Sequence, residues 1–241
     1  MASRFQAPRG TQDILPELQP YWSAVHAAIA DVTRLYGFQR IDTPVFESAA
    51  LFEKGSGDTT DIVEKEMYRF EDRGGDQLAL TPEGTPAICR AYLEHGMASW
   101  PQPVRLFTTH TMFRYDRPQK GRYQEFYQCD VDVVGSDSLV YEAELAQIYD
   151  EVFARLGLEV VIKINNRKVL AGIAEAAGIS DSFMDMTIAI DKLDKIGMEG
   201  VEKEMAGRGI PETAINKVKT ILKAKSLEEL NPLLAASAAD I

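Results

Sequence analysis

The first quarter of the chain changes from helix-type to strand-type spacing of apolar residues. Residues 17–36 have the three- and four-residue periodicity of an amphipathic helix, and Gly37 stands where a helix C-terminal cap belongs. Residues 38–46 are rich in β-formers, and Pro44 confines this segment to a strand end or edge. The apolar positions that define the helix are Leu18, Trp22, Val25, Ile29, Val32 and Leu35.

Two later segments have the alternating pattern and turn residues of β-hairpins. Residues 67–82 alternate around the turn sequence RGGD, and a polar, Gly-containing loop is expected before them at 54–61. A helix is predicted to open at about residue 83. The second hairpin pairs 104–116 with 123–135 across the connection RPQKGR. Hairpin strands with helices beside them predict an α+β fold with an antiparallel sheet.

The remainder of the chain turns from mixed to helical character. Residues 138–156 predict an amphipathic helix and 158–165 a further strand. Beyond Asn166 only short helical patterns follow, so a domain boundary is expected between 165 and 185. These helical patterns cover residues 166–177, 199–208 and 212–224.

Composition and charge narrow the classes of function. The 241 residues are 45% hydrophobic and 26% charged, which excludes a disordered or collagenous chain. A formal net charge of −11 disfavours general nucleic-acid binding, so any RNA contact must come from a local basic patch or from another part of a larger assembly. The two cysteines form no CxxC motif, and the N-terminus does not resemble a signal peptide. No apolar run approaches the ~18 residues that a membrane span requires. These features indicate a reduced, cytoplasmic protein.

The second hairpin carries the clearest candidate chemistry. Period two places Gln128, Asp130 and Asp132 on one face of the second strand. His110, Met112 and Arg114 share a face of the first strand. A solvated sheet face would explain these residues too, but the connection adds three cations, which favours a triphosphate together with a small cationic ligand. Those cations are Arg117, Lys120 and Arg122.

Two further clusters have both a structural and a functional interpretation. Glu83 in TPEGT is either an acid that favours the first turn of a helix or an acceptor for a ligand amino group beside the Thr85 hydroxyl. PRGTQD at 8–13 is either a solvated loop or part of a site. GSGD at 55–58 lacks the spacing of a phosphate-binding P-loop, and no metal-ligand set or nucleophile arrangement is apparent.

Four segments together give the chain a specific resemblance. PRGTQDILP, GFQRIDTPVFE, LTPEGTPAICR and MFRYDRPQKGRYQEFYQCDVDVVG resemble, in order, the N-terminal catalytic part of histidyl-tRNA synthetases, which are class II aminoacyl-tRNA synthetases. The resemblance runs from about residue 5 to 170. GFQRIDTPVF resembles motif 1, which builds the dimer interface in this class, and FRYDRPQKGRYQEFYQ resembles motif 2, which holds ATP and the acceptor end of tRNA.

The resemblance implies a role for each candidate residue. Arg114 would be the catalytic residue, binding the α-phosphate of ATP and the histidine carboxylate. Arg122 would contact ATP phosphates or the adenine side. Asp132 would accept from the imidazole; the family often has a glutamate here, so Asp132 is a shorter variant. The α-amino group of histidine would be held by Glu83 and Gln128, with Thr85 nearby.

The resemblance also implies an organisation and a reaction. Residues 1–170 would form the catalytic core and 171–241 part of a helical insertion subdomain, while motif 3 and an anticodon-binding domain are not found. The implied reaction activates histidine with ATP and Mg²⁺ to histidyl-adenylate, then transfers it to tRNA(His), whose acceptor end would meet the loop 116–122. A homodimer through motif 1 and no protein-bound metal are expected. Because the later arginines are not found, we expect weak or no adenylation by this chain alone.

Two other interpretations remain open from the sequence. One is a synthetase-like regulatory subunit of ATP phosphoribosyltransferase, which would bind histidine without charging tRNA. The cationic connection RPQKGR disfavours it, because such a protein docks no acceptor stem. The other is a dimeric domain without a ligand, which leaves the face carrying Arg114, Gln128 and Asp132 without a purpose.

Overall fold

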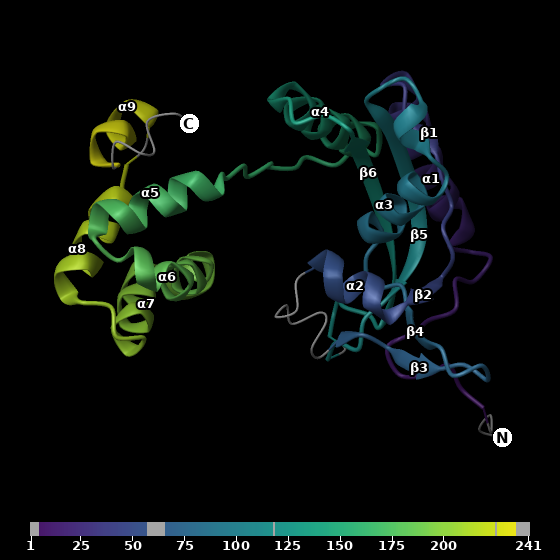
Figure 1. Ribbon diagram of the computed structural model, residues 1–241, viewed down its shortest axis with the longest axis horizontal. Coiled ribbons are helices and arrows are strands. Elements are labelled where there is room, and N and C mark those ends of the chain that lie inside the picture. The colour runs from purple at the N-terminus through teal and green to yellow at the C-terminus, as the bar shows by residue number, and fades with distance from the viewer. Residues whose placement is uncertain (1–4, 57–65, 118, 225, 235–241) are drawn as a thin grey trace. The chain divides into compact units, whose positions relative to one another are not determined.

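The computed structural model describes residues 5–56, 66–117, 119–224 and 226–234. The chain divides into two compact units, Met1–Ile162 and Lys163–Ile241 (Figure 1). Part of the polar loop expected at 54–61 lies outside the described residues, and its first residues close a helix. Among the helices that the structure describes, none combines the length and apolar character needed to cross a membrane.

The first unit is built on a long antiparallel hairpin. Strands β5 (Val104–Phe113) and β6 (Glu125–Val134) pair along their whole length, as the alternation predicted. The short strand β1 (Gln39–Arg40) adds to the other edge of β5 in parallel orientation. A second sheet has the order β2-β4-β3, with β2 (Phe46–Ser48), β4 (Gln77–Leu80) and β3 (Arg69–Glu71) all antiparallel.

Pro44 explains why the β-rich segment 38–46 contributes to both sheets. It separates β1 from β2, so the chain leaves one sheet and enters the other around it. The Pro44 and Val45 carbonyl groups accept hydrogen bonds from the side chain and the backbone N–H of Thr81. Pro44 itself lies in neither strand, which agrees with the prediction that the proline limits this segment to strand ends or edges, and the two carbonyls hold the segment that follows β4.

Helices cover both faces of the β5–β6 hairpin. The helices α1 (Gln19–Leu35) and α4 (Leu139–Arg155) pack on the face that carries Phe107 and Val131. The helix α3 (Thr85–Glu94) and the 3₁₀ turn Met97–Ser99 pack on the opposite face through Ile88 and Leu106. A further helix among the described residues of this unit, α2 (Ala49–Ser56), lies against β2 and β4. Figure 1 shows α3 and α4 beside the two long strands.

The expected strand at 158–165 is wrong. Residues 158–166 form no regular element, and the boundary between the two units falls within them. Alternating apolar residues give a segment the capacity to pair, but a strand also needs a neighbour with free backbone groups. Among the described residues this segment pairs with none, and Val161 and Ile164 are 86% and 82% exposed.

The second unit is a small helical bundle. Its helices are α5 (Arg167–Ala177), α6 (Phe183–Ile190), α7 (Leu193–Gly207), α8 (Glu212–Ile221) and the single turn α9 (Leu227–Leu230). The three helical patterns predicted from the sequence all lie within or overlap these helices. Helix α6 was not predicted, because FMDMTIAI is apolar on nearly every side and shows no helical period. The buried core of the bundle includes Ile173, Met186, Val201, Met205 and Val218.

Candidate functional site

The register of the hairpin brings the predicted polar residues onto one face. His110 lies opposite Gln128, and Thr108 lies opposite Asp130. Side chains of directly paired residues project from the same face of a sheet. The structure therefore confirms that Gln128, Asp130 and Asp132 share a face, and it adds His110 and Thr108 to it.

The start of α3 lies over this face of the hairpin. Thr85, its first residue, donates a hydrogen bond from Oγ1 to Asp132 Oδ1 at 3.0 Å. Gly84 comes even closer to the strand, because a Cβ at that position would overlap Asp130 Oδ2 and lie 2.8 Å from its carboxyl carbon. The absence of a side chain at residue 84 therefore allows the helix to begin directly above the acidic floor.

Glu83 does not lie in the first turn of a helix, contrary to the prediction. Helix α3 begins at Thr85, its first turn holds no acidic residue, and its N-cap residue makes no side-chain capping bond. Glu83 instead lies two residues before the helix, near enough for its charge to raise the pKa of Asp132. The helix-capping interpretation of Glu83 is thereby removed, and the charge of its carboxylate lies near Asp132.

Three carboxyl groups crowd this part of the site. Burial, together with the nearby charges of Asp130 and Glu83, raises the pKa of Asp132 to about 6, against the lowering effect of the Thr85 hydrogen bond. Burial also raises the pKa of Asp130, which the hydrogen bond from Gln128 and the charges of His110 and Arg114 lower. Partly buried acids that repel each other are stabilised when a cationic ligand binds between them.

The raised pKa of Asp132 determines how the free energy of unfolding changes with pH. Its pKa is about 6 in the folded chain against an ordinary value of 3.8, so the folded state binds more protons than the unfolded state between these values. Stability therefore falls as pH rises through this window, and the penalty is complete above pH 6. We expect Asp132→Asn to stabilise the chain by about 2 kcal/mol at pH 8 and by little at pH 3.5.

Urea denaturation of both proteins at the two pH values checks this expectation. The substituted asparagine keeps an oxygen that accepts from Thr85, so the variant removes the charge and not the hydrogen bond. Asp137→Asn, at an exposed position after β6, is the matched control and should change stability equally little at both pH values. An Asp132→Asn effect of the same size at pH 3.5 and pH 8 would contradict the assignment.

Arg114 is held with part of its guanidinium available. Its backbone N–H donates to the Gln124 carbonyl, which extends the hairpin by one residue. Its Nε donates to the Pro82 carbonyl at 2.9 Å, and its guanidinium lies 5.2 Å from the centre of the Phe126 ring. The two terminal nitrogens make no hydrogen bond to the residues that the structure describes. An arginine held in this way, with terminal nitrogens that bond none of the described residues, suits a carboxylate or phosphate.

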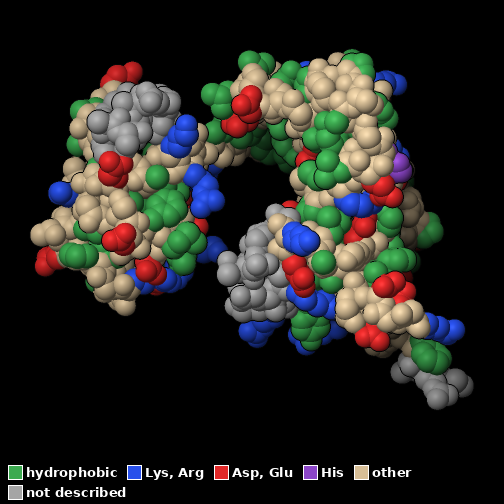
Figure 2. Space-filling model, in the orientation of Figure 1, with side chains coloured by type: hydrophobic (Ala, Val, Ile, Leu, Met, Phe, Trp, Pro, Cys, Tyr) green, Lys and Arg blue, Asp and Glu red, His purple; other side chains and the backbone are tan. Residues whose placement is uncertain are grey.

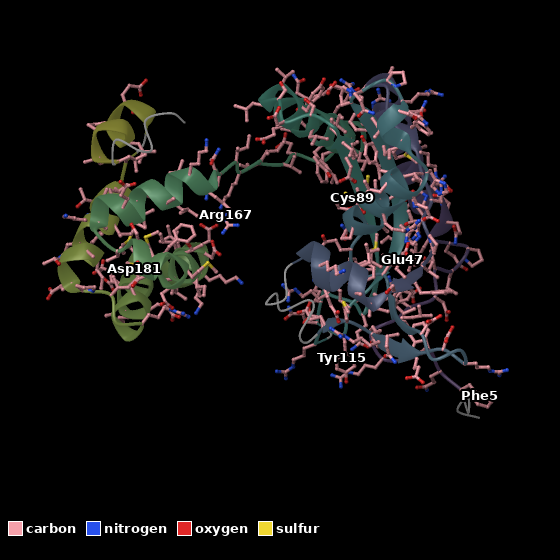
Figure 3. All side chains as sticks on the ribbon, in the orientation of Figure 1. Phe5, Glu47, Cys89, Tyr115, Arg167 and Asp181 are labelled. Atoms are coloured by element: carbon pink, nitrogen blue, oxygen red, sulfur yellow. The ribbon has the colours of Figure 1, made fainter. Side chains whose placement is uncertain are left out.

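The connection between β5 and β6 is the cationic loop predicted from the sequence. Tyr115, labelled in Figure 3, marks its start, and Figure 2 shows Lys and Arg side chains on the surface nearby. Arg122 Nη1 lies 3.0 Å from Asp116 Oδ2, and the Arg122 side chain is 62% exposed. An exposed ion pair contributes little to stability, so Arg122 can leave Asp116 for a stronger anion at small cost. Arg117 and Lys120 are also on this loop and exposed where the structure describes them.

The opposite face of β6 serves packing rather than polar chemistry. A cavity of about 480 Å³ lies between α1 and β6, where the Trp22 and Tyr127 ring centres are 4.4 Å apart. Cys129 lines this cavity, and burial raises the pKa of its thiol to about 12. A thiol with so high a pKa stays protonated and is a poor nucleophile. The prediction that Cys129 packs as a small hydrophobe is confirmed.

The alternation predicts Asp130 on the polar face of the strand, but the resemblance assigns it no role in the site. Asp130 is only 8% exposed and accepts a hydrogen bond from Gln128. The backbone of Gly84 lies so close to it that a Cβ at residue 84 would overlap its carboxylate. The period-two pattern with Gln128 and Asp132 was a signal for Asp130. No sequence signal singled out Gly84, because its role depends on how closely a helix approaches a strand.

Comparison with known proteins places the chain among one set of relatives. The family model described as histidyl-tRNA synthetase matches residues 10–240. A histidine–tRNA ligase of Phocaeicola vulgatus is 38% identical over the whole of this chain and 58% of its own length. One of Dehalococcoides mccartyi is 52% identical over 64% of this chain and 37% of its own. The chain thus spans about half the length of the curated relatives it matches.

Solved structures agree with this placement. The histidyl-tRNA synthetase of Nostoc sp. PCC 7120 covers 99% of this chain with a TM-score of 0.82 at 27% identity, and the chain covers 55% of it. A protein of Bacillus halodurans described as an ATP phosphoribosyltransferase regulatory subunit/histidyl-tRNA synthetase has a TM-score of 0.81 at 18% identity. At that identity the second likeness concerns the fold alone.

Proposed function

The chain belongs to the histidyl-tRNA synthetase family, and from this premise we propose that its site binds histidine and ATP and forms histidyl-adenylate. The arrangement of side chains on one sheet face supports this function most strongly. Acceptors for a cation (Glu83, Gln128 and Asp132) lie at the face that also presents the terminal nitrogens of Arg114, which bond none of the described residues. Histidine has matching groups, with an ammonium and an imidazole as donors and a carboxylate as acceptor.

Different acceptor side chains bind different groups of the histidine molecule in this proposal. Glu83 and Gln128 hold the α-amino group, with Thr85 beside them. Asp132 accepts from the imidazole N–H, and its bond from Thr85 leaves Oδ2 buried and without a hydrogen-bond partner among the described residues. A buried acceptor without a partner is unfavourable until a ligand donates to it. This supports Asp132 as the group that selects the side chain.

Arg114 carries the chemical step. Its fork binds the histidine carboxylate and the α-phosphate of ATP, and so aligns the carboxylate oxygen with phosphorus. As the oxygen attacks and pyrophosphate leaves, negative charge on the α-phosphate grows beside a guanidinium that needs no reorganisation. ATP enters as its Mg²⁺ complex, and Arg122 leaves its exposed pair with Asp116 to contact ATP phosphates or the adenine side.

The proposal extends to partners and location. The acceptor end of tRNA(His) approaches the loop 116–122, where a basic patch offsets the acidic net charge of the chain. A homodimer forms through the motif 1 region, supported by exposed apolar side chains on α1 and β2 that include Tyr21, Leu35 and Phe46. The protein acts in the cytoplasm.

The regulatory alternative has less support. The curated relatives described above are named as ligases, and the regulatory subunit enters only through a fold likeness at 18% identity. The cationic loop beside the site also serves a nucleotide and an acceptor end better than it serves histidine alone.

Histidine-dependent exchange between ATP and pyrophosphate tests the proposed reaction. We expect weak or no exchange by the 241-residue chain and recovery on addition of the C-terminal half of a family member, with none in Arg114→Ala. A chain that stays inactive with the added half, while the same half activates the corresponding N-terminal part of a relative, would contradict the proposal.

A further inference from the structure

Gln128 is bonded to its neighbour on the same strand face. Its Nε2 donates to Asp130 Oδ1 at 2.6 Å, across one intervening residue of β6. A side-chain amide has a donor end and an acceptor end of nearly the same shape, and only its surroundings determine which end faces which way. The partner that Gln128 meets therefore decides what it offers to a ligand.

The carboxylate of Asp130 determines the orientation of the Gln128 side-chain amide. A carboxylate only accepts hydrogen bonds, so it draws the NH₂ end of Gln128 toward itself and turns Oε1 away. An asparagine at the same place would pair with either end of the amide. The charge on Asp130 thus converts an ambiguous amide into an acceptor that is fixed toward the site.

The contact with the start of α3 and the burial of the side chain restrict the movement of Asp130. The start of α3 closes over it so tightly that a Cβ on Gly84 would lie 2.8 Å from its carboxyl carbon. The residue is 8% exposed, and its Oδ2 has no hydrogen-bond partner among the described residues. Asp130 therefore has little freedom to turn away from Gln128.

Two basic side chains near Asp130 favour its charged form. Both His110 and Arg114 are close enough to favour its carboxylate. His110 Nδ1 lies 2.9 Å from the Thr111 carbonyl oxygen and Nε2 lies 2.8 Å from that of Thr43. These two contacts hold the His110 ring on the sheet face that also carries Asp130.

We propose that Asp130 is a positioning residue, which fixes the amide of Gln128 so that Oε1 accepts from the ammonium group of the amino-acid substrate. The inference rests on the proposed function for the identity of that substrate. It adds to the site a buried carboxylate that acts through Gln128. The Glu83 carboxylate then meets the ammonium from the α3 side, and Gln128 meets it from the sheet.

A donor–acceptor swap tests the proposal. We expect Asp130→Asn to weaken histidine binding about tenfold, because its amide lets Gln128 turn over. Combining it with Gln128→Glu exchanges the roles: the new asparagine donates and the new glutamate only accepts, so an oxygen again faces the ligand. We expect the double variant to recover to within about threefold of the original affinity. Asp137→Asn is the matched control and should leave the affinity unchanged.

Calorimetric titration with histidine provides these affinities, and thermal unfolding confirms that each variant folds. If Asp130 acted only by filling space, the double variant would bind no better than Asp130→Asn. Absence of rescue, or an unchanged affinity in Asp130→Asn, would therefore overturn the proposal.

A second measurement needs no ligand. In ¹⁵N NMR spectra, one side-chain amide proton of Gln128 should be shifted downfield and protected from exchange, and both features should vanish in Asp130→Ala. Asp132→Asn removes a carboxylate of the same face that bonds Thr85 instead, and should leave them in place. Signals that persist in Asp130→Ala would refute the positioning role. If the original chain fails to bind histidine, the proposed function fails, and this measurement still decides the role of Asp130.

Discussion

Replacement of Arg114 by alanine is expected to weaken binding of a non-hydrolysable histidyl-adenylate analogue by about 100-fold or more. The estimate follows from the loss of two charge-assisted hydrogen bonds to ligand oxygens, each of about 1.5–3 kcal/mol. Arg114 has the geometry for both, because the Pro82 carbonyl and the Phe126 ring hold the guanidinium while its terminal nitrogens have no bond to the described residues. Calorimetry with the analogue measures the loss without requiring turnover.

Arg114→Lys separates charge from geometry in the same experiment. A lysine keeps the positive charge but presents a single ammonium, so we expect it to restore only part of the affinity. Arg73→Ala, in the exposed turn of the β3–β4 hairpin, is the control for a general loss of positive charge. Equal affinities for the Arg114→Ala variant and the original chain would show that the ligand does not reach this arginine.

A methyl group at residue 84 should disrupt the site by steric overlap alone. Gly84 has an ordinary helical backbone with φ of −84°, so alanine causes no backbone strain there. Its Cβ would overlap Asp130 Oδ2 and lie 3.2 Å from Met112 Cε, and neither neighbour has open space. We expect Gly84→Ala to destabilise the chain by about 2–3 kcal/mol. The shifted helix should also lose the Thr85–Asp132 bond and bind histidine at least about tenfold more weakly.

Chemical denaturation of Gly84→Ala alone and together with Asp130→Ala measures this overlap. Shortening Asp130 removes the atoms that the new methyl group meets, so the double variant should regain most of the lost stability. Gly207→Ala, in α7, is the matched control: nothing lies within 4 Å of a Cβ there, and alanine favours the helix. A Gly84→Ala protein as stable as the Gly207→Ala protein would contradict the close approach of α3 to β6.

The long hairpin and its polar face were predictable from the sequence because both depend on local periodicity. Alternation along residues 123–135 determines which side chains share a face, and the observed register between His110 and Gln128 agrees with it. The turn residues between the strands and the three- and four-residue spacing in α1 are equally local signals.

Features that depend on distant contacts were not predictable in the same way. Whether Glu83 enters the helix depends on where α3 begins, and Gly84 fits there only because β6 lies beneath it. Residues 158–165 have the composition of a strand, yet pairing requires a neighbouring strand that local pattern cannot supply. Asp130 has the alternation of a site residue, but its burial and its bond to Gln128 become visible only in three dimensions.

Recognition of histidine by this face of the hairpin is tested most directly by titration with the amino acid. Calorimetry of the 241-residue chain should detect saturable, one-to-one binding of histidine near neutral pH, weakening as pH falls through about 6, where Asp132 becomes protonated. Glutamine, which lacks the imidazole, should bind far more weakly. Asp132→Ala should abolish the preference between the two. Equal binding of histidine and glutamine by the original chain, or no binding of either, would contradict the account.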